Sequence, residues 1–141
     1  MKQRIDTSQL QQLNPSQQEK LREWWNPKEG DFAIRNFIHE FIVAYKTNDN
    51  RLQNVAKDCG CSDCCISYGE CLPLLSIGQC IELLQEISHK HLYEDIWMHT
   101  EHKPQKAGGW GWKWYCGHGD YNQYDSEELI DALFETVKSI L

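Results

Sequence analysis

The sequence lacks any long apolar run. No stretch of its 141 residues approaches the roughly 18 uninterrupted apolar residues that a membrane-spanning helix needs. Residues 1–14 are polar and rich in glutamine, without the apolar segment of a secretory signal. We therefore expect a cytoplasmic protein with no membrane partner.

Clusters of basic side chains are also missing. The chain has 14 Lys and Arg residues against 21 Asp and Glu residues, a net charge of −7. Residues 58–101 contain eight acidic side chains and one basic one, whereas residues 1–57 are net +2 and residues 102–141 net −2. Nucleic-acid backbones are bound by clustered Lys and Arg, so we expect no direct nucleic-acid binding. The acidic middle third suits either a protein partner with a basic surface or simple solvation.

The familiar signatures of catalysis are absent as well. The sequence contains no Gly-x-Ser-x-Gly, no phosphate loop, no His-Glu-x-x-His and no dinucleotide fingerprint. A cysteine and a histidine brought together by the fold remain as an alternative route to an active site. We assign no catalytic residues and expect a protein that is not an enzyme.

Each predicted helix starts at a residue whose side chain accepts hydrogen bonds from the exposed N–H groups of the first turn. The three predicted N-caps are Asn14, Ser76 and Asp125, and Gln79 and Glu128 complete capping boxes for the second and third. Apolar residues at helical spacing follow all three.

Strand signals fill the intervals between these helices. β-branched and aromatic residues from Phe32 to Tyr45 predict two strands joined near residues 35–39, with a helix over 37–44 as the alternative. Residues 93–100 and 110–116 predict two further strands, and 101–109 a loop. The predicted fold is a single α+β domain over 1–141: one antiparallel or mixed sheet of about four strands, three helices and a cysteine-rich loop at 51–72. Residues 1–13 are expected to be flexible.

Five of the seven cysteines lie between positions 59 and 71. Cys61 and Cys64 form a C-x-x-C pair, a spacing that lets two thiolates bind one zinc ion. Cys116 and His118 would complete a four-ligand site and fasten the loop to the strand at 110–116. The alternative ligands are Cys59 and Cys71. Free thiols, disulfides or a redox role compete with this zinc hypothesis.

Tryptophan alternates with other residues along the strand predicted at 110–116. Trp110, Trp112, Trp114 and Cys116 share one face, which predicts either core packing or a partner interface.

Three segments carry a family resemblance: LREWWNPKEGD, CLPLLSIGQCIELL and EELIDALFETVKSIL, with LPLLSIGQ the most specific piece. They resemble, in this order, a group of small uncharacterised proteins encoded by phages and prophages of Gram-positive bacteria. The resemblance covers about a third of the chain and implies a phage accessory protein in a bacterial cytoplasm. The group supplies no known activity, and the cysteine-rich loop lies outside these segments.

The leading hypothesis is a non-enzymatic phage protein that binds and modulates a host protein, in the manner of an anti-CRISPR inhibitor. Acidic inhibitors can occupy the basic nucleic-acid channel of an effector. The predicted contact residues are Glu82, Glu86, Glu94 and Asp95. The alternative is a zinc-binding protein whose metal is structural or supports a small hydrolase or nuclease.

Overall fold

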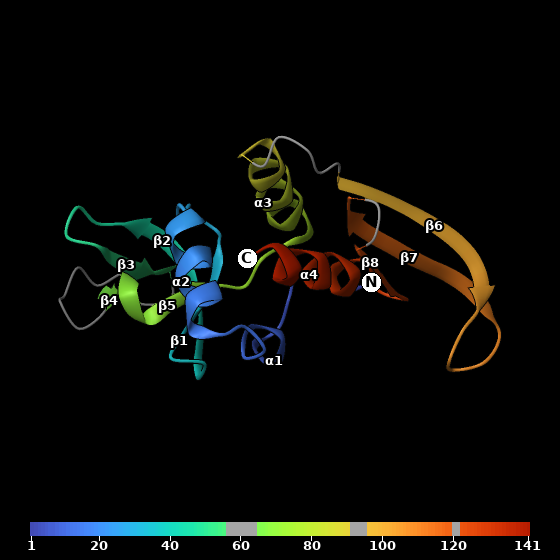
Figure 1. Ribbon diagram of the computed structural model, residues 1–141. Helices are drawn as coiled ribbons and strands as arrows, with labels where there is room; N and C mark the ends of the chain where they lie inside the picture. Colours follow the sequence, from blue (N-terminus) through green and yellow to red (C-terminus); the bar gives the residue numbers. More distant parts are fainter. Residues whose placement is uncertain (56–64, 91–95, 120–121) are drawn as a thin grey trace. The chain divides into compact units, whose positions relative to one another are not determined.

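The fold is described from a computed structural model, which covers residues 1–55, 65–90, 96–119 and 122–141. The chain groups into two compact units, each described here by itself. Unit 1 comprises Met1–Ile5 and Leu75–Leu141, and unit 2 comprises Asp6–Leu74. Figure 1 labels their elements along the sequence. The expectation of one domain over 1–141 stays a prediction.

Unit 2 contains a five-stranded antiparallel sheet of order β4-β3-β2-β1-β5, with two helices and a short 3₁₀ helix. Its elements are α1 (Thr7–Leu10), α2 (Pro15–Trp24), β1 (Phe32–Arg35), β2 (His39–Lys46), β3 (Arg51–Asn54), β4 (Cys65–Ser67), η3 (Tyr68–Glu70) and β5 (Cys71–Pro73). The first two strands and their tight connection confirm the hairpin predicted around residues 35–39.

Helix α2 begins and ends as its sequence requires. The Asn14 side chain accepts a hydrogen bond from the Gln17 N–H, which confirms the predicted N-cap. At the other end, the Tyr68 hydroxyl lies 2.7 Å from the Trp25 carbonyl oxygen and its ring stacks on the Trp25 ring at 5.6 Å. The 3₁₀ helix thereby fixes the last turn of α2 against the buried side chains of the sheet.

Residues 1–13, for which the sequence suggests flexibility, contain ordered structure. Asp6 caps the short α1 with a capping box, and Ile5, Leu10 and Leu13 are buried. Their apolar side chains are too far apart in the sequence to make a periodic pattern, so only packing reveals their role.

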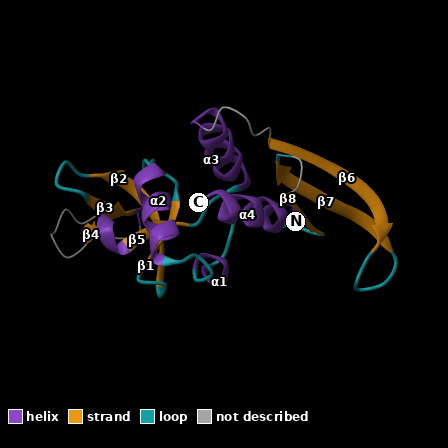
Figure 2. Ribbon diagram, viewed as in Figure 1, coloured by secondary structure: helices purple, strands orange, loops and turns teal. Residues whose placement is uncertain are grey.

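Unit 1 has helices α3 (Ile77–Lys90) and α4 (Leu129–Ile140) and a three-stranded antiparallel sheet of order β6-β7-β8. The strands are β6 (Ile96–Pro104), β7 (Trp110–His118) and β8 (Asn122–Ser126). Helix α4 packs on α3, β7 and β8. Figure 2 shows β6 and β7 as a long curved hairpin that continues past these helices.

The core of unit 1 lies between the helices and one end of this sheet. Its buried side chains come from both helices and from the second half of β7: Cys80, Leu83, Leu84, Cys116, Ile130, Leu133, Phe134 and Val137. The Ser76 hydroxyl accepts a hydrogen bond from the Gln79 N–H at 3.2 Å, and the side-chain oxygen of Gln79 accepts one from the Ser76 N–H at 3.0 Å. These two bonds confirm the capping box of α3.

The predicted architecture was wrong in its layout. The described residues form two antiparallel sheets of five and three strands and four α-helices, whereas the sequence predicted one sheet of about four strands and three helices. The predicted loop 51–72 contains two short strands, the 3₁₀ helix and the start of β5. The sequence did not reveal them, because runs of three or four residues are too short to show a periodic pattern. None of the helices is long and apolar enough to cross a membrane, as judged over the described segments.

Two smaller expectations in unit 1 also differ. Strand β6 continues through Glu101 to Pro104, where a loop was expected, because its partner β7 supplies a full antiparallel ladder. Helix α4 takes Glu128 as its N-cap residue instead of Asp125, and Asp125 lies in β8.

Replacement of Tyr68 by Phe is expected to lower the free energy of unfolding by about 1–2 kcal/mol, because the buried carbonyl of Trp25 loses its partner. Urea unfolding followed by tryptophan fluorescence measures the change. Tyr45, which is 47% exposed, provides the matched control. Its replacement by Phe should change stability by less than about 0.5 kcal/mol, and equal effects of both substitutions would contradict the assigned role of Tyr68.

Candidate interaction surface on the β6–β7 hairpin

The hairpin has a covered half and an uncovered half. Residues Trp114–His118 of β7 pair with both β6 and β8, whereas residues Trp110–Lys113 pair with β6 alone among the described strands. The loop at the tip is closed by a bond from Gln105 N–H to the Gly109 carbonyl, and Gly108 and Gly109 take positive φ angles of 92° and 78°. Glycine accepts that backbone without strain, so the two strands stay in register to the tip.

One face of the uncovered half carries aromatic rings. Trp110 is 68% exposed and Trp112 60% exposed. His102, opposite Trp112 in the ladder, lies between them, with ring centroids 5.8 Å from Trp110 and 5.3 Å from Trp112. We call these three side chains the tryptophan face. Two exposed tryptophans side by side are rare on a protein that binds nothing through them.

The opposite face of the hairpin carries a ladder of stacked rings, in the half that also pairs with β8. Trp97 stacks on His99 at 5.6 Å and His99 on Tyr115 at 4.8 Å, with interplanar angles of 20° and 6°. The ammonium groups of Lys103 and Lys113 lie 5.0 and 5.8 Å from the Tyr115 ring centroid. The rings therefore bind one another and the lysines, which leaves no broad surface here for stacking a base or a sugar.

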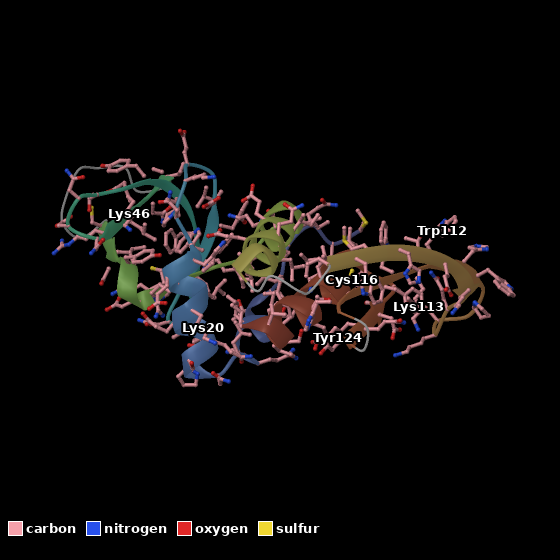
Figure 3. All side chains as sticks on the ribbon, turned by 45° about the horizontal axis from the view of Figure 1, so that its top comes forward. Lys20, Lys46, Trp112, Lys113, Cys116 and Tyr124 are labelled. Atoms are coloured by element: carbon pink, nitrogen blue, oxygen red, sulfur yellow. The ribbon has the colours of Figure 1, made fainter. Side chains whose placement is uncertain are left out.

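Charges on this same face are paired. Lys103 bonds to Glu101 and donates to the Tyr115 hydroxyl at 2.8 Å, and Lys113 pairs with Asp125 on β8. The hydrogen bond from Lys103 lowers the pKa of Glu101, and the bond to Glu101 raises the pKa of Lys103. We call the surface formed by His99, Glu101, Lys103, Lys113 and Tyr115 the charged face. Figure 3 shows Trp112 and Lys113 leaving opposite faces of β7.

A cleft of about 370 Å³ borders the charged face. Lysines and carboxylates line it together, among them Lys106 and Glu127, which accepts a bond from the Lys106 backbone N–H at 2.9 Å. At its far side the Lys2 ammonium lies 3.0 Å from Asp131. Side chains of both charges therefore line the cleft.

The predicted zinc ligands have three different locations. Cys59, Cys61 and Cys64 lie outside the described residues. Cys71 is buried in the core of unit 2, where its thiol donates to the Ser67 carbonyl at 3.4 Å. Cys116 and His118 lie in unit 1, two positions apart on β7 and both buried.

His118 has another partner in the described structure, and Cys116 is a buried thiol. His118 Nε2 lies 2.9 Å from the Ser139 hydroxyl of α4. Burial raises the pKa of the Cys116 thiol to about 11, against the thiolate that zinc requires. Within the described ranges no group of three or more His, Cys, Asp or Glu residues is placed to hold a metal ion. Zinc binding through the cysteine loop stays a prediction.

The predicted acidic contact residues are only partly visible. Glu82 and Glu86 are exposed on α3, one helical turn apart. Glu94 and Asp95 lie outside the described residues.

The tryptophan stripe is divided between the core and the surface. Cys116 is buried and Trp114 half-buried under the helices, whereas Trp110 and Trp112 are exposed. Sequence reasoning missed His102 because residues 101–109 were assigned to a loop. The available signal was the alternation of β6 itself, in which Trp97, His99 and Glu101 fall on one face.

No protein-family model, curated protein or solved structure matches this chain.

Three buried thiols should resist alkylation. Burial raises the pKa of Cys71 and Cys80 to about 12 and that of Cys116 to about 11, so about one Cys116 thiol in a thousand is ionised at pH 8. Iodoacetamide labelling followed by peptide mass spectrometry should show at least a roughly hundredfold slower reaction at these three positions than in guanidinium chloride. Labelling of Cys80 or Cys116 at the denatured rate would contradict the described core.

Proposed function

We propose that this chain is a non-enzymatic binding protein of phage origin that acts on a host protein, with the tryptophan face as its anchor. The observation that carries the proposal is the pair of exposed tryptophans, Trp110 and Trp112, on a hairpin that extends past its covering helices. The resemblance to phage-encoded proteins supports the origin.

The energetics of tryptophan support an anchoring role. Each ring can bury about 150–250 Å² against a partner, and tryptophan is the residue most enriched at binding hot spots. The ring ladder on the charged face fixes the hairpin before binding. Less conformational entropy is then lost when Trp110 and Trp112 enter their pockets.

The lysines and carboxylates of the hairpin lie on the other face, so the tryptophan face is free of formal charge apart from the titratable His102. Its partner should therefore offer apolar pockets. The acidic residues of α3, Glu82 and Glu86, fit a basic rim around such pockets. An anti-defence inhibitor of an effector with a basic nucleic-acid channel would have this combination.

Replacement of either Trp110 or Trp112 by Ala should weaken capture of the host partner by about 30-fold or more, as expected for a hot spot. The measurement is a quantitative pull-down from host lysate with mass spectrometry, followed by titration of the captured protein. Since both rings are exposed, the melting temperature should stay close to that of the wild type. Tyr45→Ala, at an exposed aromatic residue of unit 2, is the control and should bind normally.

Removal of the acidic charges separates the electrostatic part of the proposal. The quadruple change Glu82→Gln, Glu86→Gln, Glu94→Gln and Asp95→Asn should weaken binding and flatten its salt dependence, by about 0.2–1 kcal/mol for each charge that contacts the partner. If the affinity is unchanged over a range of salt concentrations, the hypothesis of a basic partner surface is wrong. The tryptophan anchor is tested separately, by the Trp110 and Trp112 variants.

A further inference from the structure

Strand β6 forms an edge of the unit 1 sheet. Over the residues that the structure describes, it pairs with β7 on one side and with no strand on the other. It is nine residues long, Ile96–Pro104, and most of its side chains are exposed or half-buried. A long unprotected edge is a template for pairing with another strand.

The register of the hairpin determines which backbone groups face this edge. The bond from Gln105 N–H to the Gly109 carbonyl marks residues 105 and 109 as a hydrogen-bonded pair. Such pairs alternate with non-bonded pairs in an antiparallel ladder, so 103, 101, 99 and 97 also direct their N–H and C=O groups toward β7. Residues 96, 98, 100, 102 and 104 direct theirs outward, and of these only Pro104 lacks an N–H.

We propose that β6 pairs antiparallel with β6 of a second copy of this chain, around a two-fold axis at Thr100. In this register the outward-directed groups of Thr100 meet those of the second Thr100, and Met98 meets His102. On the charged face, His99 of each copy lies opposite Glu101 of the other. Lys103 lies opposite Trp97. The pairs on that face are therefore complementary, because the His99 imidazole can donate a hydrogen bond to the Glu101 carboxylate and Lys103 can make a cation–π contact with Trp97.

Neighbouring registers are much poorer. In a register shifted by one residue, the outward-directed N–H and C=O groups of one strand face residues whose groups point away, so the backbone hydrogen bonds are lost. A shift by two residues in one direction places His99 opposite His99, and in the other direction it places Glu101 opposite Glu101. The first shift loses both His99–Glu101 pairs, and the second places like charges directly across the ladder, which is destabilising. The sequence of the strand therefore favours the Thr100-centred pairing.

The pairing joins two three-stranded sheets into one and closes on itself, as a two-fold interface does. It also places two tryptophan faces on the same side of the joined sheet. This inference concerns self-association and does not depend on the host partner of the proposed function.

The first test is the molar mass of the full chain without partner, by light scattering and sedimentation equilibrium. The expected result is a reversible dimer, of about twice 16.6 kDa, at concentrations up to about 100 µM. Thr100→Pro removes an outward N–H while leaving the β6–β7 bonds intact, so it should weaken the dimer at least about tenfold.

A charge exchange tests the register. Glu101→Lys places Lys opposite His99, and His99→Glu places Glu opposite Glu101, so each variant alone should dimerise at least about tenfold more weakly. Mixed together, they regain complementary pairs at both positions and should form a heterodimer. Recovery in the mixture also shows that both variants are folded.

Glu23→Lys, the same charge change on exposed α2, is the control and should leave the dimer intact. A monomer at all concentrations, or an association that continues beyond two copies, overturns the proposal. A dimer that Thr100→Pro and Glu101→Lys leave intact but Trp112→Ala dissolves also overturns it, and assigns the contact to the tryptophan face. None of these results decides whether the chain captures a host partner, which the Trp110→Ala and Trp112→Ala pull-downs test.

Discussion

The stacked rings of Trp97, His99 and Tyr115 support the hairpin in the half that also pairs with β8, next to the half that extends past the core. A two-stranded ribbon alone is marginally stable in water, since it buries little apolar surface. Here the cross-strand stack of His99 on Tyr115, with Lys103 bonded to the Tyr115 hydroxyl, gives the hairpin a second set of contacts. The Trp97 indole N–H also donates to the Gly119 carbonyl at 3.0 Å, which ties the ladder to the end of β7. The tryptophan face depends on this support, because exposed rings anchor a partner well only when their backbone is already fixed.

The two-residue period of the strands then determines which chemistry appears on which side. Since Trp110 and Trp112 alternate with Lys113 and Tyr115, the two exposed tryptophans lie on the opposite face of β7 from Lys113. Each face also changes along its length. The tryptophan side continues into Cys116 and His118, which are buried, so a single run of alternating residues passes from the surface into the core. Burial raises the pKa of both the Cys116 and the Cys80 thiol, which makes them poor nucleophiles and is consistent with a packing role.

Two of the three predicted helix caps and the first hairpin were read correctly from the sequence, whereas the cap at Asp125 and the assembly of the strands into sheets were not. The caps at Asn14 and Ser76 and the hairpin after Phe32 depend on residues within a few positions of one another, and the structure confirms them. Strands as short as Cys65–Ser67 and Cys71–Pro73 have no period of their own, and exist because β3 and β1 supply their partners. The division into two sheets is likewise decided by long-range pairing. The stripe at 110–116 shows the same limit. The sequence placed its residues on one face of a strand, but only the packing of α4 on β7 determines which of them are buried and which are exposed.

An exposed edge such as β6 usually carries features that prevent open-ended association. Pro104 removes one outward N–H near the tip, and the order of His99, Glu101 and Lys103 disfavours a strand that pairs in most other registers. The same residues favour one particular strand, because in an antiparallel second copy His99 meets Glu101 and Lys103 meets Trp97. Protection against aggregation and selection of a second copy therefore follow from one pattern, and the edge need not be covered by another element to remain specific. A strand with a uniform charge would be protected equally well but would have no complementary partner in its own sequence.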